Sequence, residues 1–465
     1  MTIKPADGVA FPVTVPVLVI GAGACGLTAA LAAHDAGAEA LVLERDRMPR
    51  GSTALSSGFI PAAGTRFQRT KGIEDSPALL TADLMTKNKG RSSSRVTARV
   101  AETVGPTLEW LADRHQVPFE VVEGFLYPGH SVLRMHATPK RTGADLMEYL
   151  LGTAERAGIA CLTSAHVVAL FADKGGRVAG VEIDRPDGAR ERVGCAALVL
   201  ACNGYGGDPA MVRQFIPEMA DAIYFGHAGN QGDALRWGEL LGGVGRDLGA
   251  YQGHGSVAHP HGILITWALM MEGGFQVNLE GRRFSSEHRG YSEQAVEVLR
   301  LPQGIAINVF DARVHALGLG FEDYRSAVAA GAVRSADTIE ALAELFGVPP
   351  QALAATLAET REMAAGTRAD PFGRDFSGKR ALTPPFFGVR VTGALFHTQG
   401  GLEVDTEARV LGRDGTPLPN LLAGGGASRG LSGPECNGYF SGGGLLSAVT
   451  LGKIAGETAA RLVCE

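Results

Sequence analysis

The chain has 465 residues, of which 45% are hydrophobic and 20% charged, and its formal net charge is −6. This composition is typical of a globular protein of two or three domains, and it argues against a surface that binds nucleic acid or an anionic membrane. Glycine is the outlier, with 64 residues, and such glycines are expected where backbone approaches a large ligand closely.

The first predicted elements form a strand–helix–strand unit. The apolar run Val15–Ile20 predicts a buried parallel strand, Leu27–Ala36 has the periodicity of a helix, and Ala40–Leu43 predicts the next strand. We expect a loop over Gly51–Gly64, which is rich in Gly and Ser, and then helices up to about Gln116.

The middle of the chain has a mixed pattern. It predicts in order a helix, the two strands of a hairpin and a buried strand: Asp145–Gly158, Val167–Phe171, Val178–Ile183 and Ala197–Ala201. From about His254 to Arg390 the character changes, and it includes a predicted strand near Phe275 and a helix over Ser292–Leu299. After His397 the Gly-rich strand–turn–helix pattern of the first part returns.

A GxGxxG motif lies between the first strand and the first helix. Gly21 allows a tight turn, Gly23 lets the backbone approach a pyrophosphate, and Gly26 lets helix and strand pack closely. The helix N-terminus presents free N–H groups to a phosphate. Glu44 ends the second strand, where a carboxylate accepts hydrogen bonds from ribose hydroxyls. Together these features predict a bound dinucleotide.

A second Gly-rich site near the C-terminus distinguishes between cofactors. The strand-like segment that begins at Asn420 runs into Gly424–Gly426, and Gly442–Gly444 opens a predicted helix that reaches Ala460. The positive end of such a helix suits the N1/C2=O side of an isoalloxazine, which carries negative charge when reduced. This second site favours FAD over NAD.

These patterns predict an α/β fold, a Rossmann-like FAD-binding domain of discontinuous sequence with an inserted α+β cap domain. The expected boundaries are 1–253 and 397–465 for the FAD-binding domain and 254–396 for the cap. The longest segment without Asp, Glu, Lys or Arg, Leu248–Met271, contains three histidines and a proline, so no membrane span is expected. The six cysteines form no CxxC pair, so we expect no metal and a reduced, cytoplasmic setting.

The chain resembles the superfamily of fumarate reductases and 3-ketosteroid Δ1-dehydrogenases. The motifs that carry the resemblance are the fingerprint, GSTALSSG at Gly51–Gly58, LVLACNGYGG at Leu198–Gly207, GNQGDAL at Gly229–Leu235, GRRFSSE at Gly281–Glu287, HTQGGLEVD at His397–Asp405 and the C-terminal Gly-rich segment. The resemblance implies that a cap closes over the substrate and that hydride moves between a substrate carbon and flavin N5.

The resemblance also implies a set of FAD contacts. Besides Gly21, Gly23, Gly26 and Glu44, the set is Ala24, Cys25, Arg45, Gly51, Ser52, Thr53, Ser56, Ser57, Gly58, Val168, Ala201, Cys202, Asn203, Gly204, Asn230, Asp233, Gly425, Gly426, Gly443, Leu445 and Leu446. The Gly51–Gly58 loop contains no histidine, where succinate dehydrogenases attach FAD covalently, so noncovalent FAD is expected. Electrons would pass to or from oxygen or a redox carrier.

Three positions resemble the carboxylate-binding residues of fumarate reductases: His254 in YQGH, Thr266, and His397 at the start of HTQGG. Histidine and hydroxyl side chains donate hydrogen bonds to carboxylate oxygens. Tyr127 is a further candidate for substrate contact. Additional candidate partners of a carboxylate are Arg429, Arg134 and His136.

Two tyrosines stand where a fumarate reductase has arginines. Four residues after Glu287, Tyr291 occupies the position of the proton-donating arginine, and it resembles instead the base of ketosteroid dehydrogenases. Such a tyrosine needs a nearby donor or positive charge, which Arg289 or His288 could supply. Tyr439 and the Gly443 N–H resemble the pair that holds a substrate ketone oxygen.

The sequence therefore predicts an FAD-dependent dehydrogenase that introduces a C=C bond next to a ketone. The expected substrate is a small cyclic ketone or keto acid, such as 4-oxocyclohexanecarboxylate, and Trp267 or Trp237 would narrow the pocket. Two alternatives stay open: a reductase of an unsaturated carboxylic acid, and a flavoprotein subunit that is active only within a complex.

Overall fold

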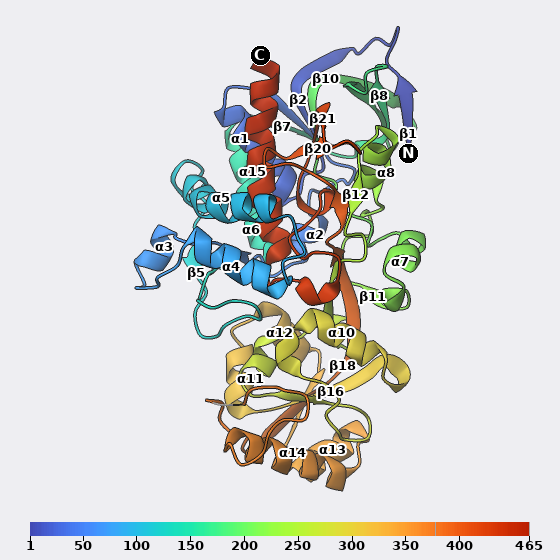
Figure 1. Cartoon of the computed structure of the whole chain (residues 1–465). Helices are drawn as coiled ribbons and strands as arrows, with labels where there is room; N and C mark the ends of the chain where they lie inside the picture. The colour runs from blue at the N-terminus through green and yellow to red at the C-terminus, as the bar shows by residue number, and fades with distance from the viewer. Residues whose placement is uncertain (377, 465) are drawn as a thin grey trace.

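The computed structural model describes residues 1–376 and 378–464, and it divides the molecule into two parts (Figure 1). Both chain ends lie in the part that contains α1, α15 and strands β1, β2 and β8 (Figure 1). The other part contains β16 and the helices α10 to α14 (Figure 1).

The first part is built on a nine-stranded mixed sheet whose central strand is β10. Its main order is β1-β8-β9-β10-β2-β3-β7, and β21 also pairs with β10 and with β20. The strands are β1 Thr2–Pro5, β2 Val13–Ile20, β3 Ala40–Leu43, β7 Ala160–Leu162, β8 His166–Ala172, β9 Val178–Asp184, β10 Arg190–Leu200, β20 Arg409–Leu411 and β21 Pro417–Ala423. The predicted parallel pairing is present, because β2 runs parallel to both β3 and β10. The predicted hairpin is present as the antiparallel pair β8–β9.

Helices of distant sequence pack together on this sheet. Helices α1 Ala24–Asp35 and α15 Gly443–Cys464 lie side by side (Figure 1). A Cβ on Gly452 would lie 2.4 Å from the Cys25 carbonyl oxygen, and one on Gly456 would lie 2.1 Å from that of Ala29. Only glycine allows this close backbone approach. The other helices of this part are α2 Gly51–Ala54, α3 Arg66–Arg69, α4 Pro77–Lys87, α5 Ser94–Asp113, α6 Gly143–Arg156, α7 Pro209–Phe215 and α8 Asp233–Leu240.

The expectation of an uninterrupted loop over Gly51–Gly64 was wrong. The segment forms the short helix α2 and then strand β4 Ile60–Pro61, which pairs with β6 Met135–Ala137 next to β5 Glu120–Val121. Local hydrogen bonds drive the turn: the Ala54 N–H donates to the Arg50 carbonyl, and the Ser56 hydroxyl donates to that of Thr53. A composition rich in Gly and Ser hides such a turn from sequence patterns.

The second part is built on a seven-stranded sheet of main order β14-β13-β18-β16-β15, with β11 and β17 also on β18. The strands are β11 Ile223–Tyr224, β13 Tyr251–Ala258, β14 Ile263–Leu264, β15 Phe275–Val277, β16 Ile305–Asp311, β17 Val333–Ala336 and β18 Phe386–Thr398. Its helices are α9 Ala268–Met271, α10 Tyr291–Leu299, α11 Ala312–Gly318, α12 Glu322–Ala329, α13 Ile339–Phe346 and α14 Pro350–Ala364. The strands β12 Gly245–Arg246 and β19 Gly401–Leu402 form a separate pair.

The long antiparallel strands β13 and β18 join the two parts. In their register His254 lies opposite Ala394, and Gln252 lies opposite His397. The boundaries expected at 254 and 396 therefore fall inside these strands, and the division into domains at those residues stays a prediction. The pairing places His254 and His397 on neighbouring strands.

A buried group of ion pairs fixes the segment that leads into α10. Glu287 Oε2 lies 2.7 Å from Arg283 Nη2 and 3.0 Å from Arg374 Nη1, and all three side chains are buried. Removing one member of a buried group of this kind leaves an uncompensated charge, which is strongly destabilising. The Glu287 carbonyl also accepts a hydrogen bond from Trp267 Nε1 at 3.2 Å, so the group holds a cavity-lining tryptophan in place.

Candidate active site

A cavity of about 1930 Å³, which includes open solvent at its mouth, is lined by residues of both parts. The lining comes from β2, α1, α2 and α15 on one side and from β13, β18, α10 and α12 with their flanking residues on the other. The lining runs from the fingerprint turn at Gly21 to Tyr127, Tyr291 and Tyr439. One continuous cavity therefore connects the expected cofactor residues with the expected substrate residues.

The fingerprint glycines have the positions that the motif predicts. Gly21 has a φ of +104°, and a Cβ there would lie 2.6 Å from the Ala201 carbonyl oxygen. A Cβ on Gly26 would lie 1.8 Å from the Gly21 carbonyl oxygen, so helix α1 packs directly on the turn. The buried Glu44 accepts from the Ala22 N–H at 2.9 Å, which fixes its carboxylate at the cavity wall.

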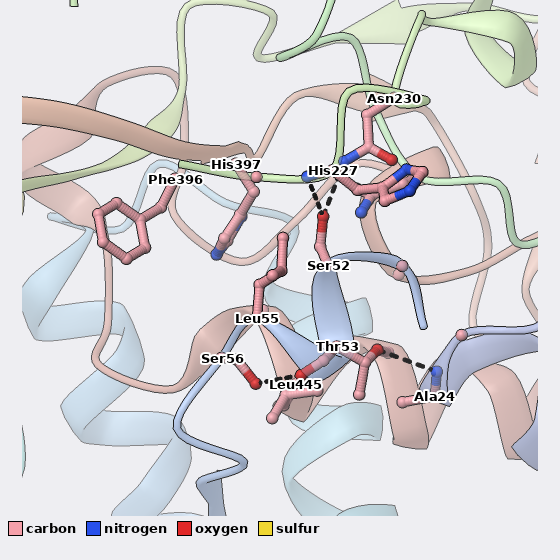
Figure 2. A pocket seen from close by; sticks show the side chains of 18 of the residues that line it. Ala24, Ser52, Thr53, Leu55, Ser56, His227, Asn230, Phe396, His397 and Leu445 are labelled. Atoms are coloured by element: carbon pink, nitrogen blue, oxygen red, sulfur yellow. Dashed lines mark hydrogen bonds between the residues drawn. The ribbon is translucent and has the colours of Figure 1, made fainter. Parts of the chain in front are cut away.

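Helix α2 brings hydroxyl groups to the N-terminus of α1 (Figure 2). Thr53 Oγ1 accepts from the Ala24 N–H at 3.1 Å. Ser52 Oγ accepts from the His227 N–H at 3.2 Å and from Asn230 Nδ2 at 2.8 Å (Figure 2). The Ser52 hydroxyl is also hydrogen-bonded with Tyr224, so these contacts fix Ser52 at the cavity wall.

Most of the residues expected at FAD line the cavity. Those that do are Gly21, Gly23, Ala24, Cys25, Glu44, Arg45, Gly51, Ser52, Thr53, Ser56, Ser57, Gly58, Ala201, Cys202, Asn203, Asn230, Asp233, Gly425, Gly426 and Leu445. Gly26 shapes the turn from behind and does not line the cavity.

Four further expected contacts, Val168, Gly204, Gly443 and Leu446, are not among the lining residues, and their contact with FAD stays a prediction. On strand β8 it is Val167 that lines the cavity, since neighbouring side chains point to opposite faces. A Cβ on Gly204 would lie 2.0 Å from Thr398 Oγ1, so this glycine packs under β18. On α15 the lining residues are Gly444, Leu445 and Ala448, whereas Leu446 packs in the core.

Three buried tyrosines meet at the other end of the cavity. Tyr127, Tyr291 and Tyr439 all line it, and the rings of Tyr291 and Tyr439 are 5.9 Å apart at an angle of 63°. Burial raises the pKa of Tyr291 to about 12, while hydrogen bonds with Ser441 and Tyr439 lower it. Burial raises the pKa of Tyr439 further, and the bond with Tyr291 adds to the rise. The bond lowers the pKa of Tyr291 and raises that of Tyr439, as expected when Tyr439 donates and Tyr291 accepts.

The remaining tyrosine and Ser441 complete this group. Burial raises the pKa of Tyr127, and a hydrogen bond with Thr266 opposes the rise. The Ser441 hydroxyl also reaches the Pro128 carbonyl oxygen at 3.1 Å, so its single proton is shared between that oxygen and Tyr291.

Both predicted histidines line the same end and are uncharged at neutral pH. Burial lowers the pKa of His254 to about 3 and that of His397 to about 4. The His254 ring stacks on Tyr291 at 4.8 Å and 22°. Its Nδ1 accepts from the Ser256 N–H at 3.2 Å, which leaves the proton of the neutral ring on Nε2.

His397 packs against the start of α15. A Cβ on Gly444 would lie 2.8 Å from His397 Nε2, so a glycine is needed there. Figure 2 shows the His397 ring pointing into the space bordered by Leu55, Ser56 and Leu445. The ring thus lies where the helix N-terminus meets the cavity.

The expected roles of Gly443 and Arg289 beside the tyrosines stay predictions, and the geometry does not favour them. The Gly443 N–H donates to the Phe440 carbonyl at 2.8 Å and is not free, whereas the N–H of Gly444, which lines the cavity, lowers the pKa of Tyr439. Arg289 does not line the cavity. Nor does His288 line it, and its pKa is lowered to about 4, chiefly by burial, so it brings no positive charge to Tyr291.

The candidate carboxylate partners elsewhere are also excluded by the geometry. Arg134 is fully buried between Asp75 and Asp83, and Arg429 pairs with Asp247 at 2.7 Å. His136 contacts Thr65 Oγ1 at 2.8 Å. None of the three lines the cavity.

Other lining residues lie outside the motifs of the sequence. They are mainly apolar or come from short loops: Phe59, His166, Phe225, His227, Leu264, Phe321, Asp323 and Phe396. Phe321 and Asp323 come from the start of α12, whose local sequence reads as an ordinary surface helix. No pattern within that helix indicates that it borders a cavity.

The first half of the cavity fits FAD, since a close-packed turn and a fixed carboxylate surround the start of α1. Within residues 1–376 and 378–464, no group of His, Cys, Asp and Glu is placed to hold a metal ion. In the same described residues, every helix is too short or too polar to cross a membrane.

Comparison with known proteins agrees with this geometry. Residues 16–444 match the model of the FAD binding domain family. The NADH:fumarate oxidoreductase of Klebsiella pneumoniae is 29% identical over 97% of this chain, and the chain spans about half of that protein, 48%. Fumarate reductase (cytochrome) of Shewanella frigidimarina is 25% identical over 96% of the chain and 77% of that protein.

Solved structures give the same result for the fold. The open conformation of a flavocytochrome c3 fumarate reductase matches with a TM-score of 0.81 at 26% identity, over 98% of this chain and 80% of that one. The 3-ketosteroid-Δ4-(5α)-dehydrogenase of Rhodococcus jostii RHA1 matches with a TM-score of 0.78 at 24% identity, over 98% and 99%. The chain therefore belongs to the FAD binding domain family and is an FAD-dependent oxidoreductase of the type that acts on CH–CH groups.

Proposed function

We propose that the protein is a desaturase that introduces a C=C bond between the α and β carbons of a small cyclic ketone. The observation that carries the proposal is the meeting of Tyr127, Tyr291 and Tyr439 at the end of the cavity beyond the helix start of α15. FAD, when bound noncovalently, supplies the acceptor for the hydride of the β carbon.

Tyr291 is the proposed base that takes the α proton of the ketone. Its phenol is buried, its pKa is about 12, and it accepts hydrogen bonds that favour the ionised form. The Gly442 N–H and the Ser441 hydroxyl also lower this pKa. Both remain beside Tyr291 when the Tyr439 O–H bonds to a ketone instead. The ionised form thus keeps donors in a site shielded from water.

Tyr439 is the proposed donor to the ketone oxygen. It has a single O–H, which in this structure is bonded with Tyr291. A bound ketone would take that O–H, and the Gly444 N–H at the N-terminus of α15 would stand next to it. Donors placed where an enolate oxygen develops lower the barrier to removal of the α proton.

The proposed substrate class is a small cyclic ketone or keto acid, such as 4-oxocyclohexanecarboxylate. His254 Nε2–H and Thr266 lie beside the tyrosines and would contact the far side of the ring. Trp267 lines this end and narrows it. Oxygen or a redox carrier would accept the electrons.

A Tyr291→Phe variant tests the base. We expect it to retain FAD and to lose turnover about 10²–10⁴-fold, the usual contribution of a general base. The measurement is anaerobic stopped-flow reduction of the flavin by cyclohexanone and its 4-substituted relatives. Tyr149→Phe is the matched control, because Tyr149 packs on the outer side of α6 and does not line the cavity. Retained turnover in Tyr291→Phe would contradict the assignment of Tyr291 as the base.

Reduction of an unsaturated carboxylic acid is the second candidate function. It is favoured by the likeness to the fumarate reductases of Klebsiella and Shewanella. The discriminating experiment reduces the flavin first and then measures its reoxidation by fumarate, acrylate and urocanate. Fast reoxidation by such an acid, without reduction by any ketone, would favour this function. Failure of both reactions with an artificial electron acceptor would favour a subunit that needs a complex.

A further inference from the structure

The substrate end of the cavity has a single charged side chain, and that side chain is acidic. Of the charged residues that line the cavity, Glu44, Arg45 and Asp233 belong to the fingerprint end, where Arg45 Nη1 donates to the Gly229 carbonyl at 2.7 Å. The fourth is Asp323, on helix α12 of the second part. No lysine and no second arginine is among the lining residues in the described chain.

Asp323 belongs to the substrate end because of its neighbours. Helix α12 packs against β14, whose Leu264 lines the cavity two residues before Thr266. The ring of Phe321, which precedes α12, lies 5.7 Å from the Phe125 ring, and the Phe125 ring lies 4.7 Å from that of Tyr127, between centroids. An aromatic chain thus connects the start of α12 to the tyrosine group. In Figure 1, α12 lies on the side of the second part that faces the first.

The carboxylate of Asp323 has no compensating charge. It forms no ion pair with any described residue, and the surrounding chain and Glu322 raise its pKa. The side chain is exposed in the first turn of α12, and it lines the cavity there. Its neighbours there, Leu264 and Phe321, are apolar.

The histidines cannot offset this charge. His254 and His397 are uncharged at neutral pH because burial disfavours their protonated forms. A carboxylate brought to this end would lose water without meeting a cation, and a like charge would face it.

We infer that Asp323 makes the substrate end selective against carboxylates, so that an uncharged ring ketone is preferred to the corresponding keto acid. The inference rests on the proposed function for the ketone and decides between its two substrate classes. Asp323 acts here as a specificity residue. The hydride and proton transfers remain those of the tyrosine group.

The test compares three ketones that differ in one substituent: 4-methylcyclohexanone, 4-oxocyclohexanecarboxylate and 4-(dimethylamino)cyclohexanone. We expect kcat/KM of the FAD-loaded enzyme to be lower for the keto acid than for the uncharged ketone. The kcat/KM for the protonated amine should not show this decrease. Asp323→Asn should narrow the gap between the uncharged ketone and the keto acid by about five- to tenfold, the size of one like-charge interaction near a surface.

Glu322→Gln is the matched control. Glu322 is the neighbouring acid in the same first turn of α12, but it lines a separate cleft with Lys140 and Arg141. Both changes remove one negative charge from the same helix end, so they cost the helix a similar amount. Glu322→Gln should leave the ratio unchanged. A wild-type preference for the keto acid, or equal ratios in the two variants, would overturn the inference.

A binding measurement separates this inference from the proposed function. If no ketone reduces the flavin, the proposed function fails, and charge selection is then measured with 4-methylphenol and 4-hydroxybenzoate through their perturbation of the oxidised flavin spectrum. We expect tighter binding of 4-methylphenol and a smaller ratio of the two Kd values in Asp323→Asn. Binding of neither phenol, or tighter binding of 4-hydroxybenzoate, would overturn it.

Discussion

The reactivity of this site depends on the hydrogen bonds that set the pKa values of its buried tyrosines. Tyr291 and Tyr439 are buried and hydrogen-bonded to each other, and this bond lowers the pKa of Tyr291 and raises that of Tyr439. Neither arginine nor lysine contributes, since no such side chain lines this end in the described residues. Hydrogen bonds therefore do the work that a positive charge would otherwise do.

The pH dependence of flavin reduction follows from this arrangement. The base form of Tyr291 is the ionised one, and its pKa is about 12, so the reactive fraction grows as the pH rises and does not reach a plateau below that value. We expect the rate of flavin reduction by cyclohexanone to rise about tenfold per pH unit between pH 7 and 10. Stopped-flow measurements across this range check it, and a flat profile would contradict it. Ser441→Ala, which removes a group that lowers this pKa, should reduce the rate at every pH in the range.

At the scale of elements, the start of α15 connects the cofactor end of the cavity to the tyrosine end. Leu445 and Ala448 line the former, and Gly442, Gly444 and Tyr439 line the latter. The helix is held by close contact with α1, which itself begins at the fingerprint turn. A change at the first residues of α15 therefore affects both ends.

Two adjacent glycines test this element. A Cβ at Gly444 would lie 2.8 Å from His397 Nε2, whereas one at Gly443 would meet Tyr439 at an ordinary 3.7 Å. We expect Gly444→Ala to push the His397 ring into the cavity and to lower FAD occupancy and the Tm, since overpacking costs about 1–3 kcal/mol. Gly443→Ala should behave as wild type. The ratio of flavin to protein absorbance and a thermal melt measure both, and indistinguishable variants would refute the expected displacement.

At the scale of the whole molecule, the cavity is closed by two parts that meet along β13 and β18. A ligand that binds only this folded arrangement stabilises it, by about 2.7 kcal/mol at a concentration of 100 times its Kd. Removal of FAD should therefore lower the Tm of the protein, and added FAD should restore it.

The mode of FAD attachment is a separate prediction. The Gly51–Gly58 segment has no histidine, but His227 and His397 do line the cavity. We expect noncovalent FAD, so acid precipitation should leave all the flavin in the supernatant. A protein with covalently attached flavin, treated in parallel, provides the control. Flavin fluorescence that stays with the denatured chain on a gel would show that one of these histidines is linked to it.

The sequence by itself determined the parts of the fold that depend on neighbouring residues. The strand–turn–helix around Gly21 and Gly26 and the helix start after Gly442 are recognisable because tight turns and close packing restrict the residue type locally. Family resemblance placed Tyr291 and Tyr439 at the substrate end, and the structure brings both to the cavity.

Only the tertiary structure decided contacts that depend on register and on long-range packing. Val167 faces the cavity in place of Val168, and the Gly443 N–H is taken by Phe440, because a shift of one residue turns a group to the other side. Asp323 reaches the substrate end through the packing of α12 on β14, a contact between segments far apart in the chain. Local sequence patterns do not predict such packing. The charge at the substrate end could therefore be identified only in the folded structure.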